Sequence, residues 1–110
     1  SPKSLYYQFR KAIDDGESTF RMSGGEQLRD YLHVDEVAKY IVSIALADRD
    51  FGVINVCSGT PISIRRLVEG WKKEFGSDIE LQLGYYDYVD YEPLAFWGDN
   101  TYLSSLETNI

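Results

Sequence analysis

The feature that most constrains this fold is a short, nearly continuous apolar run at residues 51–57, Phe-Gly-Val-Ile-Asn-Val-Cys. Such a run is typical of a strand buried on both faces, because helices cover each side of a parallel sheet. The turn-forming sequence Ser-Gly-Thr-Pro at residues 58–61 would end this strand. The run therefore predicts an α/β fold in which at least part of the sheet is parallel.

Four helical patterns accompany this strand. Each combines apolar residues at helical spacing with a capping side chain or a terminal glycine. The second helix is apolar on more than half of its circumference, so we expect it to pack between other elements. Gly70, inside the third helix, predicts a close approach by another segment. The predicted caps and stops are Ser1–Pro2 and Gly16 for the first helix, Asp35 for the second, Ser63 and Gly76 for the third, and Asp99 for the last.

Three further segments are compatible with strands, at residues 19–22, 27–34 and 79–83. In a strand over residues 27–34, Arg29, Tyr31 and His33 would share one face because side chains alternate. That face would present a polar surface to a ligand, although spacing alone favours a solvated strand face. Helices alternating with short strands again predict the α/β class, within one small domain.

Charge and composition exclude several classes of partner. The 110 residues carry 11 basic and 18 acidic side chains, a net charge of -7. We therefore expect no nucleic-acid partner, since such partners require a basic surface. No apolar run approaches the roughly 18 residues of a membrane span, so no membrane partner is expected. The single cysteine excludes an internal disulfide and favours a cytoplasmic protein. Because no basic residue follows Lys73, an anion site must draw its cations from the first two thirds of the chain.

The residues alone do not indicate a catalytic site. One histidine and one cysteine cannot assemble a metal site, and no Ser-His-acid arrangement is plausible. We expect His33 to be a hydrogen-bonded structural residue and Cys57 to be a small buried side chain. The glycines at residues 23–25 lack the strand-to-helix context of a dinucleotide-binding loop. We interpret the spacing Tyr7-x-x-x-Lys11 as coincidental, because it arises often in amphipathic helices.

Three sequence blocks together resemble the NAD-dependent epimerase/dehydratase family, the extended short-chain dehydrogenases that act on nucleotide sugars. The blocks are Gly25-x-Gln27-x-Arg29-Asp30-Tyr31-Leu32-His33-Val34-x-x-Val37-Ala38, then Phe51-Gly52-x-x-Asn55-Val56-x-Ser58-Gly59 followed by Ile62-Ser63-Ile64, and Tyr91-Glu92-Pro93-Leu94-Ala95-Phe96-Trp97-Gly98-Asp99. The resemblance implies that residues 1–110 are the C-terminal substrate-binding part of a Rossmann-type enzyme. Its N-terminal NAD(P)-binding domain, with the glycine-rich loop and the catalytic Tyr-x-x-x-Lys pair, would be absent here.

The resemblance also implies roles for individual residues. Arg29 would bind the pyrophosphate of a nucleotide sugar, as guanidinium can bond phosphate oxygens in bidentate fashion. The segment from Thr19 to Arg21 would contact the base, on which Phe20 or Tyr31 would stack; simple strand packing explains Tyr31 equally well. Family members place a second phosphate-binding arginine where this chain has Val89. Either Arg21 or tyrosine hydroxyls such as that of Tyr88 take its place, or the nucleotide is held differently.

These implications define an expected function. The chain would be the nucleotide-sugar-binding portion of an NAD- or NADP-dependent epimerase, dehydratase or reductase, an oxidoreductase, isomerase or lyase of deoxysugar or surface polysaccharide biosynthesis. The parent enzyme would oxidise the sugar at C4, whereas these residues would hold no catalytic residue, bind no cofactor and be inactive alone. The alternative is a non-catalytic protein-interaction module that uses the aromatic segment at residues 85–97.

Overall fold

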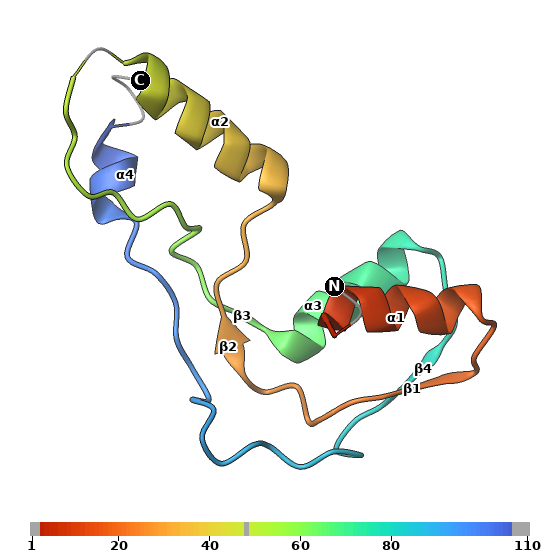
Figure 1. Cartoon of the computed structure of the whole chain (residues 1–110). Helices are drawn as coiled ribbons and strands as arrows, with labels where there is room; N and C mark the ends of the chain where they lie inside the picture. The colour runs from red at the N-terminus through yellow and green to blue at the C-terminus, as the bar shows by residue number, and fades with distance from the viewer. Residues whose placement is uncertain (1–2, 48, 107–110) are drawn as a thin grey trace. The chain divides into compact units, whose positions relative to one another are not determined.

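The computed structural model describes residues 3–47 and 49–106, which form helices and short strands (Figure 1). This confirms the predicted α/β class. The chain divides into two compact units: unit 1 comprises Ser1–Gln27 and Ser63–Leu94, and unit 2 comprises Leu28–Ile62 and Ala95–Ile110. The elements are α1 (Leu5–Asp14), β1 (Thr19–Arg21), β2 (Leu28–Arg29), α2 (Val34–Leu46), β3 (Ile62–Ser63), α3 (Ile64–Glu74), β4 (Glu80–Gln82) and α4 (Thr101–Leu106).

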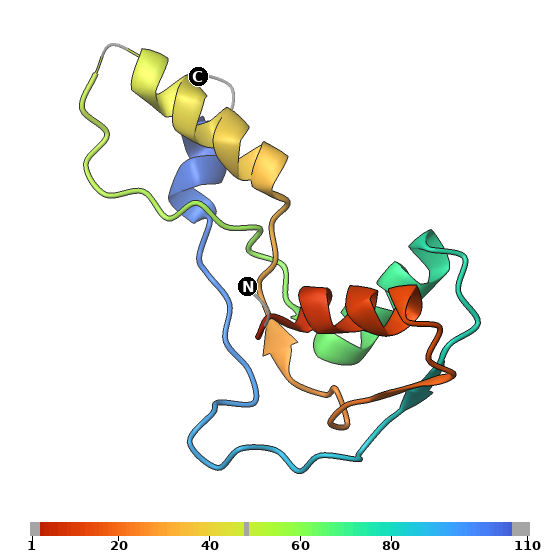
Figure 2. The same ribbon diagram turned by 45° about the vertical axis from the view of Figure 1, so that its right-hand side comes forward.

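Unit 1 is built around the apolar stripes of α1 and α3, and Figures 1 and 2 show α1 lying across α3. Its core cluster contains Phe9 and Val68, both fully buried, together with Phe20, Met22 and Ile79. β1 pairs with β4 in parallel, with Phe20 opposite Leu81. The expectation that part of the sheet is parallel is therefore confirmed in this unit.

Local signals fix where the helices of unit 1 begin and end. The Ser63 hydroxyl accepts a hydrogen bond from Arg66 N and caps α3, as predicted. Gly16 and Gly76 follow α1 and α3 with φ of 72° and 61°, which confirms both as helix stops. The predicted start at Ser1–Pro2 lies outside the described residues. The α1 cap is Ser4, whose hydroxyl accepts a hydrogen bond from Tyr7 N.

Unit 2 contains α2 and α4. Leu103 and Leu106 of α4 are buried, and the Tyr102 hydroxyl donates to the carbonyl of the buried Phe51. Asp99 accepts a hydrogen bond from the backbone nitrogen of Thr101, the first residue of α4, although Asn100 is the residue that directly precedes the helix.

The predicted cap of α2 is wrong. Its cap is His33, whose Nδ1 accepts a hydrogen bond from Asp35 N, so Asp35 lies inside the first turn with Glu36. The expectation that His33 is a hydrogen-bonded structural residue is confirmed. The carboxylates of Asp35 and Glu36 still complement the positive end of the helix dipole.

Several tertiary expectations are also wrong. Residues 51–57 form no strand, and the Val53 side chain is 91% exposed. Helix α2 has no buried residue, although the sequence predicted that it would be packed between other elements. The strand predicted at 27–34 is reduced to β2, and a Cβ built on Gly70 meets no atom within 4 Å, so no segment approaches it closely. A strand is stable only beside a partner, and no described residue exchanges a backbone hydrogen bond with residues 53–56.

Candidate functional site

Arg29, at the end of β2, is the one charged side chain that is buried among the described residues, with 8% of its surface exposed. Its Nη1 donates to the Leu28 carbonyl at 2.8 Å. Its guanidinium carbon lies 4.3 Å from the centroid of the Phe96 ring. A guanidinium is costly to bury unless hydrogen bonds and a polarizable surface surround it. These contacts therefore hold the Arg29 charge in a defined position and orientation.

The segment that carries Phe96 is anchored to β2 by its backbone. Leu28 and Ala95 form an isolated parallel bridge, and Phe96 N donates to the Leu28 carbonyl at 3.2 Å. The Leu28 carbonyl thus accepts from both Phe96 N and the Arg29 side chain. Phe96 itself is 53% exposed. The Arg29 guanidinium and the Phe96 ring are therefore held against each other by the contacts of Leu28 and do not move independently.

Asp30 ties three segments of unit 2 together. Its Oδ1 accepts from Ser58 N at 2.9 Å and from the Ser58 hydroxyl at 2.7 Å, and its Oδ2 accepts from Gly59 N at 2.9 Å and Gly98 N at 3.2 Å. Burial by itself would raise the pKa of Asp30, but the hydrogen bonds from Ser58, Gly59 and Gly98 outweigh it and lower the pKa below its ordinary value. Asp30 is therefore an ionised structural acceptor beside Arg29.

Cys57 lies against the same segment. A Cβ built on Gly98 would come within 2.5 Å of the Cys57 sulfur, so only glycine fits there. Cys57 is half-buried rather than fully buried as predicted, because one side of it faces the Gly98 backbone while the rest of the segment at 51–57 has no covering sheet.

Tyr31 follows in unit 2 with 45% of its surface exposed. It does not continue a strand face with Arg29, because β2 ends at Arg29. The shared polar face expected for Arg29, Tyr31 and His33 is therefore wrong: Arg29 is buried, whereas Tyr31 and His33 are exposed.

In unit 1, the predicted base-contacting residues lie together. Thr19, Phe20 and Arg21 form β1 and line an open hollow of about 360 Å³. The hollow is also lined by Gln8, Glu17 and Tyr86, which the sequence did not predict. The Phe20 ring packs edge-on against Phe9 at 5.1 Å and is 7% exposed, so it forms part of the core at the base of the hollow. The hollow therefore combines polar lining side chains with the apolar Phe20.

Arg21 is held by the loop that follows β4. Its guanidinium carbon lies 4.7 Å from the Tyr85 ring centroid. The backbone nitrogens of Tyr85 and Tyr86 both donate to the Met22 carbonyl, at 2.9 and 3.4 Å. The loop and β1 are thereby fixed to each other, and the exposed Arg21 side chain has its guanidinium against an aromatic face.

Tyr88 lies further along the same loop after β4. Its hydroxyl accepts a hydrogen bond from Glu26 N at 3.1 Å, and a Cβ built on Gly24 would come within 2.6 Å of that hydroxyl. Gly24 is thus required for close packing against Tyr88. The Val89 side chain, where a second phosphate-binding arginine was expected, is 42% exposed.

The glycines at 24 and 25 do not form a dinucleotide cradle. The space beside Gly24 is filled by Tyr88, and a Cβ on Gly25 would come within 3 Å of the Arg65 backbone. These glycines accommodate protein atoms, so residues 24 and 25 do not provide the open backbone that a dinucleotide needs. The described residues also contain no group of three or more side chains that could hold a metal ion, and none of their helices is long and apolar enough to cross a membrane.

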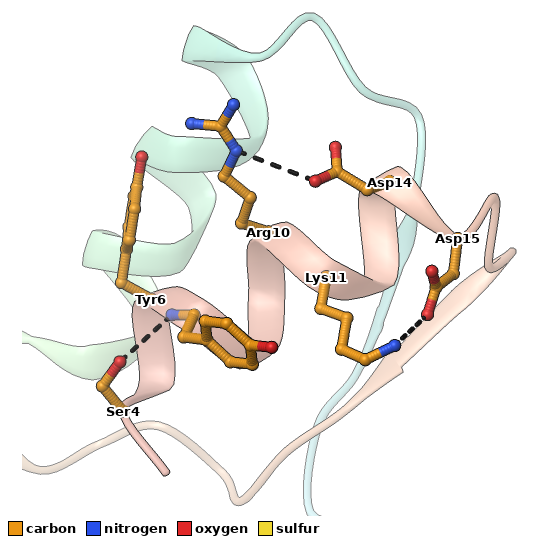
Figure 3. A pocket seen from close by; sticks show the side chains of 7 residues that line it. Ser4, Tyr6, Arg10, Lys11, Asp14 and Asp15 are labelled. Atoms are coloured by element: carbon orange, nitrogen blue, oxygen red, sulfur yellow. Dashed lines mark hydrogen bonds and ion pairs between the residues drawn. The ribbon is translucent and has the colours of Figure 1, made fainter. Parts of the chain in front are cut away.

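A larger open hollow of about 550 Å³ lies along the exposed face of α1 (Figure 3). It is lined by Ser4, Tyr6, Tyr7, Arg10, Lys11, Asp14 and Asp15. The Lys11 ammonium donates to Asp15 at 2.6 Å, and this hydrogen bond raises the pKa of Lys11. The Lys11 charge is therefore directed at Asp15, which agrees with the interpretation that the Tyr7-x-x-x-Lys11 spacing is coincidental.

The predicted site residues thus fall into two groups, Thr19, Phe20, Arg21 and Tyr88 in unit 1, and Arg29 and Tyr31 in unit 2. Sequence reasoning missed Phe96 as the partner of Arg29. It also missed Tyr85 as the partner of Arg21. Aromatic enrichment at 85–97 was the only sequence signal for either pairing.

Comparisons with known proteins identify the family to which this chain is related. The model of the NAD dependent epimerase/dehydratase family matches residues 1–57, just over half of the chain. Among curated proteins, the dTDP-6-deoxy-L-talose 4-dehydrogenase (NAD(+)) of Aggregatibacter actinomycetemcomitans is 27% identical over 95 residues, which are 86% of this chain and 35% of that protein.

Solved structures share the fold. A UDP-N-acetylglucosamine 4-epimerase from Methanobrevibacter ruminantium M1, in complex with UDP-N-acetylmuramic acid, matches with a TM-score of 0.77 and 32% identity, over 97% of this chain and 35% of that one. A UDP-glucuronic acid 4-epimerase from Bacillus cereus, in complex with UDP-glucuronic acid and NAD, matches with a TM-score of 0.77 and 21% identity, over 97% of this chain and 34% of that one. The chain spans about a third of the length of these relatives.

Proposed function

The chain belongs to the NAD dependent epimerase/dehydratase family, and we propose that it forms the nucleotide-sugar-binding portion of an NAD- or NADP-dependent epimerase, dehydratase or reductase. The ligand is a nucleoside diphosphate sugar. Two relatives support this ligand class, because one was solved with UDP-N-acetylmuramic acid and the other with UDP-glucuronic acid. The deoxytalose dehydrogenase relative supports a deoxysugar pathway, such as one that supplies a surface polysaccharide.

The buried guanidinium of Arg29 carries the proposal. A chain with a net charge of -7 repels anions unless a cation is placed for them. Arg29 is placed in this way, since the Leu28 carbonyl and the Phe96 ring fix its orientation. Fixing the side chain in advance reduces the entropy lost when a diphosphate binds. Arg29 is thus the pyrophosphate anchor.

The nucleoside is bound by the residues around β1. Thr19 and Arg21 form the polar rim of the hollow in unit 1, and Tyr86 lines it as well. Phe20 supplies the apolar base of the hollow rather than a free stacking face, because its ring is packed on Phe9. Tyr31 offers an exposed ring for stacking. The Tyr88 hydroxyl accepts a hydrogen bond from Glu26 N and so keeps the loop after β4 close to residues 24–26.

Residues 1–110 act as a binding domain and carry no cofactor. The proposal assigns the NAD(P) site and the catalytic tyrosine to a Rossmann domain outside these residues, and it is supported by the packing of the glycines at 24 and 25 against protein atoms. The contribution of this chain is to bind the nucleotide and present the sugar. Turnover therefore requires both parts of the enzyme, and residues 1–110 alone are inactive.

Calorimetric titration of the 110-residue chain with UDP-, dTDP-, CDP- and GDP-sugars tests this function. Losing a charge-assisted hydrogen bond costs about 1.5–3 kcal/mol, which corresponds to a roughly 10- to 150-fold weaker Kd. We expect that loss in Arg29→Ala. The matched control is Arg49→Ala, because Arg49 stacks on the Phe51 ring at 4.4 Å in the same unit. Absence of binding to every nucleotide sugar, or equal losses in both variants, would refute the proposal.

The second candidate is an interaction module, and the exposed aromatic loop of unit 1 favours it. Tyr91 has 90% of its surface exposed, among the acidic residues Asp87, Asp90 and Glu92. Nucleotide binding by the wild-type chain separates the two candidates. The substrate-binding function predicts binding that Tyr91→Ser leaves unchanged, whereas an interaction module predicts no nucleotide binding in any variant.

A further inference from the structure

We propose that Asp30 is a positioning residue for Arg29: its carboxylate holds the segment that carries Phe96 against the arginine and thereby sets the affinity for pyrophosphate. The inference rests on the proposed function of Arg29 and adds a second residue, Asp30, that sets how tightly Arg29 binds pyrophosphate. It starts from the two backbone attachments of that segment. Phe96 N donates to Leu28 O at 3.2 Å, and Gly98 N donates to Asp30 Oδ2 at 3.2 Å.

These two hydrogen bonds bracket the stacked pair on both sides. Leu28 and Asp30 are the residues immediately before and after Arg29, and the donors, Phe96 N and Gly98 N, lie two residues apart. The segment has no helix or strand over residues 96–100 to stiffen it. The Phe96 ring can therefore keep its place over Arg29 only while both attachments persist.

The side of Asp30 that faces away from Gly98 is equally fixed. Its Oδ1 accepts from both the backbone nitrogen and the hydroxyl of Ser58, and its Oδ2 also accepts from Gly59 N. Ser58 O in turn accepts from Asn100 Nδ2 at 2.9 Å. Because the carboxylate is anchored to residues 58–59, it is a rigid point from which the Gly98 segment is held.

The charge of Asp30 makes the proposal testable by the sign of an effect. A carboxylate next to a phosphate-binding arginine repels a diphosphate, so electrostatics alone predicts that Asp30→Asn binds the nucleotide more tightly. Positioning predicts the opposite. An asparagine has one oxygen and one NH2 group, so the NH2 group would face the N–H donors of Gly59 and Gly98 or those of Ser58. One set of attachments is then lost.

The experiment is calorimetric titration with the nucleotide sugar that the wild-type chain binds best. We expect Asp30→Asn to weaken binding roughly tenfold, about the effect of one hydrogen bond to a charged group. Ser58→Ala is the matched control, because it removes only the hydroxyl donor to Oδ1 and leaves the backbone bonds from Ser58 N, Gly59 N and Gly98 N that anchor the carboxylate. It should bind within about twofold of wild type. Unchanged or tighter binding by Asp30→Asn would overturn the proposal.

A double-mutant cycle separates positioning from a general loss of structure. In an Arg29→Lys background the stacked guanidinium is already gone, so Asp30→Asn should weaken binding by less than about twofold. An additive, roughly tenfold loss in that background contradicts the proposal.

Phe96→Leu provides an independent test if Asp30→Asn folds poorly. It leaves the hydrogen bonds of Asp30 in place and should weaken binding by a similar factor, and wild-type affinity in Phe96→Leu also overturns the proposal.

An NMR measurement on the protein without ligand tests this inference separately from the proposed function. The Arg29 guanidinium carbon lies 4.3 Å from the Phe96 ring centroid, so the Nε–H resonance of Arg29 should show a ring-current shift in a nitrogen–proton NMR spectrum. Asp30→Asn should move this resonance towards the position of a free arginine, and Ser58→Ala should not. If the wild-type chain binds no nucleotide sugar, the proposed function fails, yet the NMR shift still decides whether Asp30 positions Arg29. An unshifted resonance in Asp30→Asn refutes the positioning role.

Discussion

Gly25 offers a sharp test of how the loop before β2 is held. It has φ of 71°, and a built Cβ would lie 2.8 Å from Arg65 Cβ and 2.9 Å from Arg65 N. The Gly25 carbonyl also accepts from Arg65 N at 2.8 Å, at the first turn of α3. A side chain at this position would therefore meet backbone that cannot move without breaking a hydrogen bond. We predict that Gly25→Ala destabilises unit 1 strongly.

The expected magnitude follows from three effects. The left-handed conformation costs an alanine about 1–2 kcal/mol. Lower entropy of the unfolded chain returns about 0.4–1 kcal/mol, and forcing atoms into packed structure costs about 1–3 kcal/mol. The net loss for Gly25→Ala is about 2–3 kcal/mol. Gly16→Ala is the matched control, because Gly16 has φ of 72° but no atom within 4 Å of its built Cβ. Its loss should be about 1 kcal/mol or less.

The assay is urea denaturation followed by the fluorescence of Trp71, which packs edge-on against Tyr6 at 5.0 Å in unit 1. A Trp97→Phe background removes the tryptophan of unit 2, so the signal reports unit 1 alone. Gly25→Ala should lower the midpoint clearly more than Gly16→Ala, with an unchanged slope. Equal losses in the two variants would show that the close approach of Arg65 is not a constraint, and the reasoning would then be refuted.

Three further predictions use the same denaturation assay. Phe9 is fully buried, so Phe9→Ala should cost about 3–5 kcal/mol; a loss below about 1 kcal/mol would contradict the described core. Ser63→Ala should cost about 1 kcal/mol through the lost cap of α3, while Ser63→Asp should retain most of the stability. Because hydrogen bonds lower the folded-state pKa of Asp30, unit 2 should be fully stabilised above the unfolded pKa of about 3.9 and should lose that stability as pH falls through the folded value. Urea midpoints of unit 2 measured by Trp97 fluorescence between about pH 6 and pH 2 should show this fall in the wild type and a smaller one in Asp30→Asn, and equal slopes would contradict it.

Signals that operate within a few residues were read correctly from the sequence. The Ser63 cap and the stops at Gly16 and Gly76 depend on hydrogen bonds and backbone angles that span one turn. The prediction from local sequence was wrong where two nearby residues, His33 and Asp35, can each cap the same helix. His33 caps α2 in place of Asp35, since its Nδ1 can accept the hydrogen bond from Asp35 N.

Signals that depend on a covering partner were misread. The apolar run at 51–57 and the apolar circumference of α2 both predicted burial, yet Val53 and Leu46 are 91% and 79% exposed. Apolar composition reports that a surface is suited to burial, whereas burial itself requires atoms on the other side. The chain spans about a third of its relatives, and the described residues supply no cover for these two surfaces.

The sequence by itself determined the α/β class and the family, because helix periodicity, strand composition and motif order are all properties of the linear chain. Only the tertiary structure decided that Arg29 is buried against Phe96, that Arg21 lies on Tyr85, and that Asp30 joins residues 58–59 to Gly98. Each of these contacts unites residues 28 to 68 positions apart. No local pattern encodes them, since the pairing is selected by the packing of the whole unit and by the need to give every buried charge a partner.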